Sequence, residues 1–210
     1  MMTSRDQELV VALCGAVRFF SLEQLAREFW TGGAAGKRQA RKRISRLEGY
    51  GFLSTIQALV RPLLPLENPV LVWAPPERTP DFAGVSRELR RRWKEPANLA
   101  ELIHATPRAQ RIFGGIAYRG VKNLCQTTHD LHVAEIFLRY RRQGEWAGCV
   151  WVGEDEIARS GDTGAVPDAA LRSAAGRYKR FIEFGGAYAE DRVAHFHEHC
   201  LDRQVPYELW

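Results

Sequence analysis

The first fifty residues repeat apolar positions with the period of an α-helix. Residues 4–18 form the first predicted helix, with Ser4 as its N-cap candidate. Its apolar stripe consists of Leu9, Leu13, Ala16 and Val17. A second helix is predicted from Ser21 to about Trp30, because residues 21–24 have the S-x-x-Q pattern of a capping box. Both segments are expected to bury one face.

A third helix is predicted from about Ala34 to Glu48, after the turn at residues 31–33. Apolar side chains at positions 40, 44 and 47 lie on one side of it, and cations lie on the other. These cations are Lys37, Arg38, Arg41, Lys42, Arg43 and Arg46. A basic helix face is often merely solvated, but six cations against one acid favour a polyanionic partner.

Two short strands are predicted after the third helix, at residues 52–56 and 70–73, and the loop between them is rich in proline. We interpret them as a β-hairpin. Three helices, the third of them basic, followed by a hairpin are the order of a winged helix-turn-helix. Residues 1–75 are therefore predicted to be a winged-helix domain that binds double-stranded DNA. Bases would be read from the early outward positions of the third helix, for which Lys37, Arg38 and Arg41 are candidates.

The charge of the chain is distributed unevenly. Residues 1–97 carry 16 Lys/Arg and 10 Asp/Glu, a net charge of +6, whereas residues 98–210 carry 14 and 15, a net charge of −1. This asymmetry favours a basic nucleic-acid module followed by a near-neutral one. Residues 76–126 are predicted to be a connector with a short basic helix at about 85–94. Its cations could flank the DNA, but a solvated linker helix is the favoured interpretation.

The remainder of the chain, residues 127–210, predicts a second domain. Thr127 or Thr128 is expected to cap a helix that runs to about Arg142. Strands are predicted at residues 149–152, 167–171 and 178–184, followed by a helix at 189–203 and a strand at 206–210. The whole chain is thus expected to have an α+β fold, with a winged helix followed by an αβββαβ domain.

Three carboxylates of this second domain are arranged along the chain like those of a known catalytic signature. Asp168 follows a proline at a strand start, Glu183 lies near a strand end, and Glu135 lies on the preceding helix. The pattern resembles the PD…(D/E)xK signature of restriction-endonuclease-like nucleases. In such sites two carboxylates hold Mg²⁺ and a lysine two residues after the second acid helps to activate water. Here that position is Gly185, and Lys179 lies four residues upstream of Glu183 on the same strand face.

Other interpretations of these polar residues stay open. Glu183 interrupts an apolar run and needs a partner, so a salt bridge with Arg177 or Arg180 is as plausible as a metal role. His195 and His199 have the i, i+4 spacing of a zinc-binding pair, but the further ligands are missing, and a solvated helix face is the favoured interpretation. No metal or other cofactor is expected, except Mg²⁺ in the nuclease alternative.

The order of the whole chain resembles the replication-relaxation family. The resemblance rests on a winged helix, a histidine-containing helix at residues 128–133, a strand that begins Pro-Asp-Ala and a strand that contains Ile-Glu. It implies a DNA-binding protein with a degenerate nuclease-like domain, linked to replication, mobilisation or transcriptional control of plasmids and mobile elements. The alternatives are a Mg²⁺-dependent nuclease and a protein–protein adaptor. A homodimer, or a protein partner bound through residues 127–210, is also expected.

Neither a membrane span nor a secretory signal is expected. The chain has no run of 18 apolar residues, and its N-terminus lacks a basic segment followed by an apolar one. Its four cysteines form no CxxC pair, so neither a zinc ribbon nor a disulfide framework is indicated. A cytoplasmic location is the resulting expectation.

Overall fold

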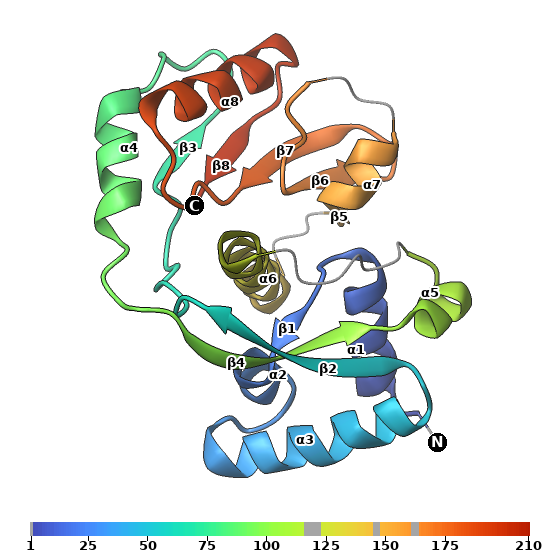
Figure 1. Cartoon of the computed structure of the whole chain (residues 1–210). Coiled ribbons are helices and arrows are strands. Elements are labelled where there is room, and N and C mark those ends of the chain that lie inside the picture. The colour runs from blue at the N-terminus through green and yellow to red at the C-terminus, as the bar shows by residue number, and fades with distance from the viewer. Residues whose placement is uncertain (1, 116–122, 145–147, 161–163) are drawn as a thin grey trace. The chain divides into compact units, whose positions relative to one another are not determined.

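The structure is a computed structural model that describes residues 2–115, 123–144, 148–160 and 164–210. The chain divides into two compact units: unit 1 comprises residues 1–63 and 96–139, and unit 2 comprises residues 64–95 and 140–210. Helices and strands occur in both (Figure 1). The predicted α+β class is therefore confirmed.

Unit 1 begins with helices whose N-termini are capped locally. Its elements are α1 (Ser4–Gly15), β1 (Phe20–Ser21), α2 (Leu22–Phe29), α3 (Gly33–Gly49), β2 (Leu53–Val60), β4 (Asn98–Ala105), α5 (Pro107–Phe113) and α6 (Leu124–Gln143). The last turn of α6, from residue 140, belongs to unit 2. The predicted capping box at Ser21 is present. A second one caps α1 from Thr3, one residue before the predicted cap. Helix α6 begins at Leu124, before the predicted caps at Thr127 and Thr128.

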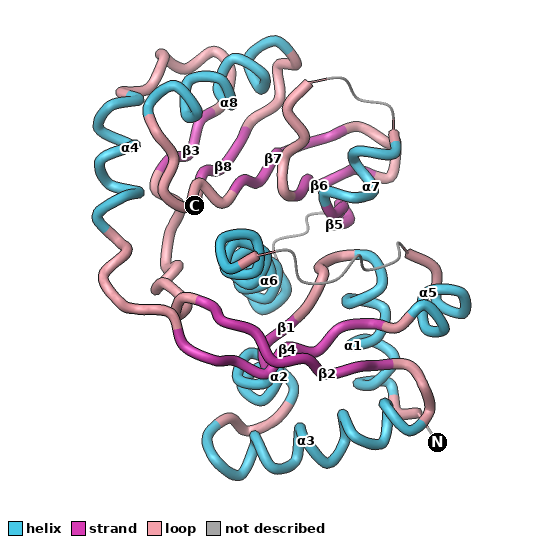
Figure 2. Tube along the Cα trace, in the orientation of Figure 1, coloured by secondary structure: helices cyan, strands magenta, loops and turns pink. Residues whose placement is uncertain are grey.

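The sheet of unit 1 has the strand order β1-β4-β2, and both pairs are antiparallel. The β2–β4 register runs from Leu53 opposite Ala105 to Val60 opposite Asn98. Figure 2 shows α2 and α3 on the same side of this sheet. Buried apolar side chains fill a core between the sheet and α6: Phe19, Ala58, Val60, Leu102 and Leu131.

Unit 2 contains a five-stranded sheet of order β3-β8-β7-β6-β5. Its elements are β3 (Leu71–Trp73), α4 (Phe82–Arg91), β5 (Cys149–Gly153), α7 (Glu154–Arg159), β6 (Ala169–Ser173), β7 (Tyr178–Glu183), α8 (Glu190–Asp202) and β8 (Tyr207–Leu209). Strands β5, β6 and β7 pair antiparallel in sequence order, and α8 then crosses over to place β8 parallel to β7. Helix α8 packs against α4 (Figure 1).

The predicted hairpin of residues 52–56 and 70–73 is wrong in its second strand. Residues 71–73 pair with β8 instead, and the antiparallel partner of β2 is β4. Trp73 is 2% exposed and stacks on Tyr207 with ring centroids 5.6 Å apart. The local pattern identified a strand, but the burial of its tryptophan in another core decided which strand it joins.

The predicted boundaries at residues 75 and 126 also differ from the observed units. The segment expected to connect two domains contains α4, which belongs to unit 2, and β4 and α5, which belong to unit 1. A fragment of residues 1–97 would lack β4, the strand that joins β1 to β2. Within the described ranges, no helix combines the length and apolar character that crossing a membrane requires.

Candidate functional site

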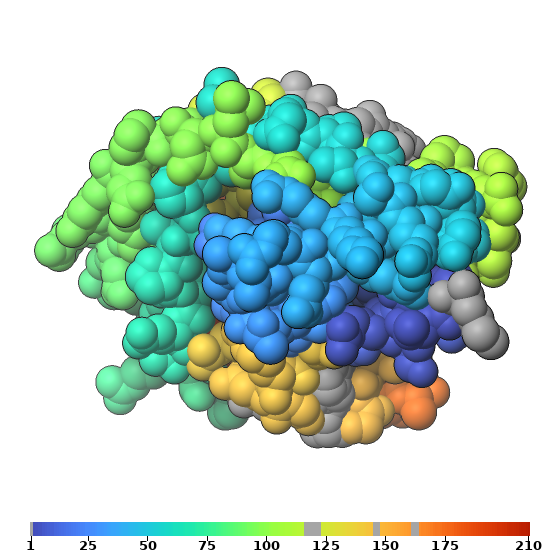
Figure 3. Space-filling model, turned by 90° about the horizontal axis from the view of Figure 1, so that it is seen from below, coloured from blue at the N-terminus to red at the C-terminus, as the bar shows by residue number. Residues whose placement is uncertain are grey.

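Helix α3 is held against α2 by a short glycine-rich turn. Gly32 and Gly33 have φ of 69° and 59°, a conformation that glycine adopts without steric cost. A Cβ at Gly36 would lie 3.4 Å from the carbonyl oxygen of Ala26, so the two helices approach closely at this point. The predicted apolar side chains of α3, at positions 40, 44 and 47, are buried. The opposite face of α3 is therefore fixed outward, and it faces the viewer in Figure 3.

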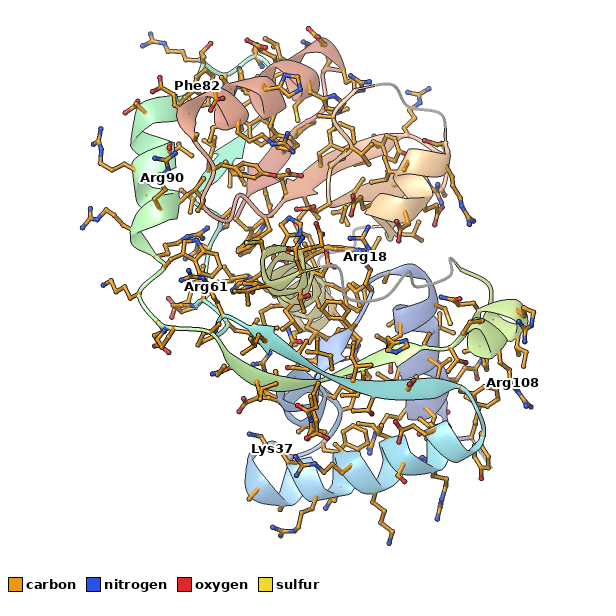
Figure 4. All side chains as sticks on the ribbon, in the orientation of Figure 1. Arg18, Lys37, Arg61, Phe82, Arg90 and Arg108 are labelled. Carbon is orange, nitrogen blue, oxygen red and sulfur yellow. The ribbon has the colours of Figure 1, made fainter. Side chains whose placement is uncertain are left out.

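The structure divides the six predicted cations of α3 into two sets. Lys37, which Figure 4 shows near the start of the helix, pairs with Glu23 at 3.0 Å, and Arg41 pairs with Glu101 of β4. Arg43 also belongs to this set, because it pairs with Asp6. The other set is Arg38, Lys42 and Arg46, which we call the α3 triplet. All three are exposed, and within the described ranges they make no ion pair.

Arg43 has a structural role rather than the predicted place on the DNA face. Its side chain is 17% exposed and donates two hydrogen bonds to Asp6 of α1, whose side chain is 2% exposed. Burial alone would raise the pKa of Asp6, but the hydrogen bonds from Arg43 and Thr3 outweigh burial and lower that pKa from 3.8 to about 2. The pair ties α1 to α3. The sequence places Arg43 among the cations of the third helix, but it does not reveal that an acid of another helix lies beside it.

The positive charge of the chain is more concentrated than the sequence halves indicated. Unit 1 carries 15 Lys/Arg and 8 Asp/Glu, a net charge of +7, whereas unit 2 carries 15 and 17, a net charge of −2. Unit 1 thus carries the whole surplus of positive charge.

In unit 2 the structure brings two of the predicted carboxylates together. Asp168 directly precedes β6 and Glu183 ends β7, and the neighbouring pair Ala169–Ile182 fixes them opposite each other. The amide of Asp168 donates to Glu183 Oε2 at 3.1 Å, and the amide of Phe184 donates to Asp168 Oδ2 at 2.7 Å. Both residues are buried, at 8% and 4% exposure. Each carboxylate therefore accepts a hydrogen bond from the backbone beside the other.

Two side chains that sequence reasoning missed complete this carboxylate cluster. The Tyr188 hydroxyl donates to Glu183 Oε1 at 2.5 Å, and the Arg192 guanidinium lies over the Tyr188 ring, 5.2 Å from its centroid. Burial and then the negative charges of Glu183 and Asp168 raise the pKa of Tyr188 well above its usual value. Tyr188 therefore stays a hydrogen-bond donor at neutral pH. The five-residue separation from Glu183 gave no sequence signal for this contact.

The position at which the nuclease motif has its lysine is Gly185 in this chain, and it is closely packed. A Cβ at Gly185 would lie 2.9 Å from Leu89 Cδ1 and 3.0 Å from Leu209 Cδ1, and both leucines are fully buried. A longer side chain at this position would require these leucines to move. Lys179, the upstream substitute, is exposed at the start of β7.

Glu135, the third predicted carboxylate, lies on the part of α6 that belongs to unit 1. Its Oε2 accepts from Gln24 Nε2 at 3.1 Å, and Arg27 donates to its Oε1 at 2.7 Å. Glu135 thus links α6 to α2 within unit 1.

Another buried carboxylate of unit 2, Glu208, was not predicted. Its Oε2 accepts from the Tyr140 hydroxyl at 2.7 Å and from Trp210 Nε1 at 3.0 Å, and Arg180 pairs with its Oε1. Arg180 was a predicted partner of Glu183 and is instead bound here. Glu208 interrupts an apolar stretch, as Glu183 does, so the same signal could have found it.

The histidines of α8 do not form the solvated face that was favoured. His195 is exposed, but His197 and His199 are 3% and 7% exposed. His197 Nδ1 lies 3.1 Å from the Tyr207 hydroxyl, and burial lowers its pKa. In the described part of the chain, no three His, Cys, Asp or Glu residues are grouped so that they could hold a metal ion.

Comparisons of the chain with protein-family models, with curated proteins and with solved structures found no match. The site is therefore interpreted from its own residues.

Proposed function

We propose that unit 1 is a winged-helix module that binds double-stranded DNA with α3 as its recognition helix. The observation that carries the proposal is the α3 triplet, three exposed cations on a helix whose other face is buried. The element order α1-β1-α2-α3-β2-β4 supports it, because three helices and an antiparallel strand pair are the elements of a winged helix-turn-helix. In this interpretation the β2–β4 ribbon is the wing.

The spacing of the α3 triplet fits a duplex. Arg38, Lys42 and Arg46 follow each other at intervals of four residues and so lie on one face of the helix. With a rise of 1.5 Å per residue they span about 12 Å, which is similar to the width of the major groove. Phosphates on either side of the groove are the ligands that this spacing suits best, and Arg38 lies near the N-terminal end, where recognition helices contact bases.

The biological setting that we propose follows the resemblance stated above. The protein would act in the replication, mobilisation or transcriptional control of plasmids and mobile elements. Unit 2 would bind a second copy of the chain or a protein partner, since paired modules read paired half-sites on DNA. The net charge of −2 on unit 2 is consistent with this division of roles.

We expect the full chain to bind a generic 30-base-pair duplex with an affinity that falls steeply as salt rises. Each phosphate contact contributes about 0.9 to the slope of log K against log salt, so the α3 triplet alone predicts a slope of about −2.7 or steeper. Fluorescence anisotropy between 50 and 300 mM NaCl measures it. No binding, or a slope near zero, would contradict DNA binding and favour the adaptor alternative.

A Mg²⁺-dependent nuclease is the second candidate, and the adjacency of Asp168 and Glu183 is the observation that favours it. Three observations favour a non-enzymatic role instead. Both carboxylates already accept backbone hydrogen bonds, Tyr188 donates to one of them, and the lysine position is closed by Leu89 and Leu209. Cation binding alone would not orient and deprotonate a water molecule.

We expect no cleavage of plasmid DNA by the full chain in 10 mM Mg²⁺ or Mn²⁺. The Asp168→Ala/Glu183→Ala variant should behave like the parent in the nicking assay. It should nevertheless be less stable by about 2 kcal/mol or more, because the buried amides and Tyr188 lose their acceptors. Nicking by the parent and none by the variant would establish the nuclease.

A further inference from the structure

Helix α4 of unit 2 is anchored by one face. Leu89 is fully buried, and Phe82 and Val85 pack against the same core. The Ser86 hydroxyl donates to the backbone oxygen of Tyr188 at 2.9 Å. The helix predicted as a solvated linker is therefore an integral part of unit 2.

The five cations at the end of this helix have different environments. The Arg92 guanidinium turns inward, donates to the Trp210 carbonyl at 3.1 Å and lies 5.7 Å from the Phe184 ring centroid. Burial lowers the pKa of Arg92, and the charge of Glu88 acts in the opposite direction. Arg92 is thus engaged with other residues of unit 2.

The other four cations face outward. They are Arg87, Arg90, Arg91 and Lys94, and we call them the α4 cations. All four are exposed, and in the described part of the chain none of them makes an ion pair. Figure 4 labels Arg90 on α4. Intervals of three and four residues place Arg87, Arg90 and Arg91 along one stripe of the helix, and Lys94 lies three residues beyond its last residue.

This stripe stands out against the charge of its own unit. Unit 2 has 15 Lys/Arg and 17 Asp/Glu, so without the α4 cations its net charge would be −6. The α4 cations are therefore a local group of four positive charges in a unit that is otherwise acidic. Four like charges that make no ion pair within the described ranges create a local potential that attracts a polyanion.

We propose that the α4 cations bind the phosphate backbone of double-stranded DNA, as a contact separate from that of α3. Arg87, Arg90 and Arg91 cover about 6 Å along the helix axis, Lys94 follows just beyond the end of the helix, and a duplex presents one negative charge per about 1.7 Å. A fixed row of cations therefore meets several phosphates at once. The inference rests on the proposed function for its ligand but concerns a different surface in a different unit.

The test uses the full chain and the 30-base-pair duplex. Arg87→Gln/Arg90→Gln/Arg91→Gln should reduce the slope of log K against log salt by about 2 to 3 and weaken binding at 0.15 M NaCl at least fivefold. The matched control, Arg159→Gln/Arg177→Gln/Lys179→Gln, removes three exposed cations from the same unit. It should change the affinity less than twofold. Thermal unfolding monitored by circular dichroism establishes that both variants fold.

The outcomes separate this inference from the proposed function. If the α4 variant matches the control, or loses affinity without a change in slope, the α4 surface does not bind DNA. If only Arg38→Ala/Lys42→Ala/Arg46→Ala weakens binding, the α3 assignment stands and the α4 inference is wrong. If only the α4 substitutions weaken binding, the α4 inference stands and the α3 assignment is wrong. A further arm measures binding to phosphatidylcholine vesicles with 30% phosphatidylglycerol. If the α4 substitutions abolish vesicle binding and leave DNA binding unchanged, the surface binds a membrane and the inference is overturned.

Discussion

Replacing the α3 triplet with alanine is expected to weaken duplex binding more than tenfold at 0.1–0.15 M salt, about 1.4 kcal/mol or more. Arg38, Lys42 and Arg46 are exposed and make no ion pair in the described part of the chain, so their removal should cost little stability. The loss of three phosphate contacts should also reduce the salt slope by about 2.7. Anisotropy titrations at four salt concentrations measure both quantities.

Two further variants make this result specific. The Arg159→Gln/Arg177→Gln/Lys179→Gln control removes the same charge from unit 2 and should bind nearly as the parent does. Arg41→Ala should have a smaller effect than the triplet, because Glu101 already neutralises that guanidinium. A triplet variant with the affinity and slope of the parent would remove α3 from the DNA interface.

Substitution of Asp6 by alanine is expected to lower the free energy of unfolding of unit 1 by roughly 3 kcal/mol. The reason is that Arg43, with a side chain only 17% exposed, would lose its counter-charge, and Thr3 would lose the partner of its capping box. Arg41→Ala is the matched control, because its pair with Glu101 leaves the arginine side chain 58% exposed, and a solvent-exposed pair should contribute far less to stability. Urea unfolding measures both, with the transition assigned to unit 1 by hydrogen exchange of α1 and α3. Equal effects of the two substitutions would contradict a structural role for Asp6 and Arg43.

The pH dependence of this contribution has a definite sign. The pKa of Asp6 is lowered from 3.8 to about 2 in the folded chain, so its stabilising contribution is complete above about pH 4 and is lost as the pH falls toward 2. The stability difference between the parent and Asp6→Asn should therefore be constant from pH 7 to about pH 5 and shrink below pH 4. A difference that grows on acidification would mean that the pKa of Asp6 is raised instead.

The identity and extent of most elements could be predicted from the sequence. The capping box at Ser21, the amphipathic third helix and the apolar strands of unit 2 depend on neighbours within a few residues, which the sequence displays directly. The uneven distribution of charge along the chain could also be predicted, because it depends only on which residues each segment contains. Of the candidate site residues, Asp168 and Glu183 could be named from the resemblance, but their proximity follows only from the pairing of β6 with β7.

Contacts between distant segments could not be predicted in this way. The partner of β2 is β4, about 40 residues further along the chain, and the strand between them joins another sheet. Nothing local distinguishes residues 71–73 from residues 98–105 as the second strand of the ribbon, because both have strand propensity. Burial of Trp73 in the core of unit 2 and of Leu102 in that of unit 1 decides between them.

The sequence by itself determined most of the helices and strands, although not β4, α5 or α7, and it determined that the third helix is basic and that the lysine of a nuclease motif is a glycine. Only the tertiary structure decided which cations of α3 are available, because Asp6, Glu23 and Glu101 come from other elements and engage Arg43, Lys37 and Arg41. It likewise decided that Tyr188 completes the carboxylate cluster. The physical reason is that charge and propensity belong to a residue and its near neighbours, whereas the availability of a charge depends on what the fold places beside it.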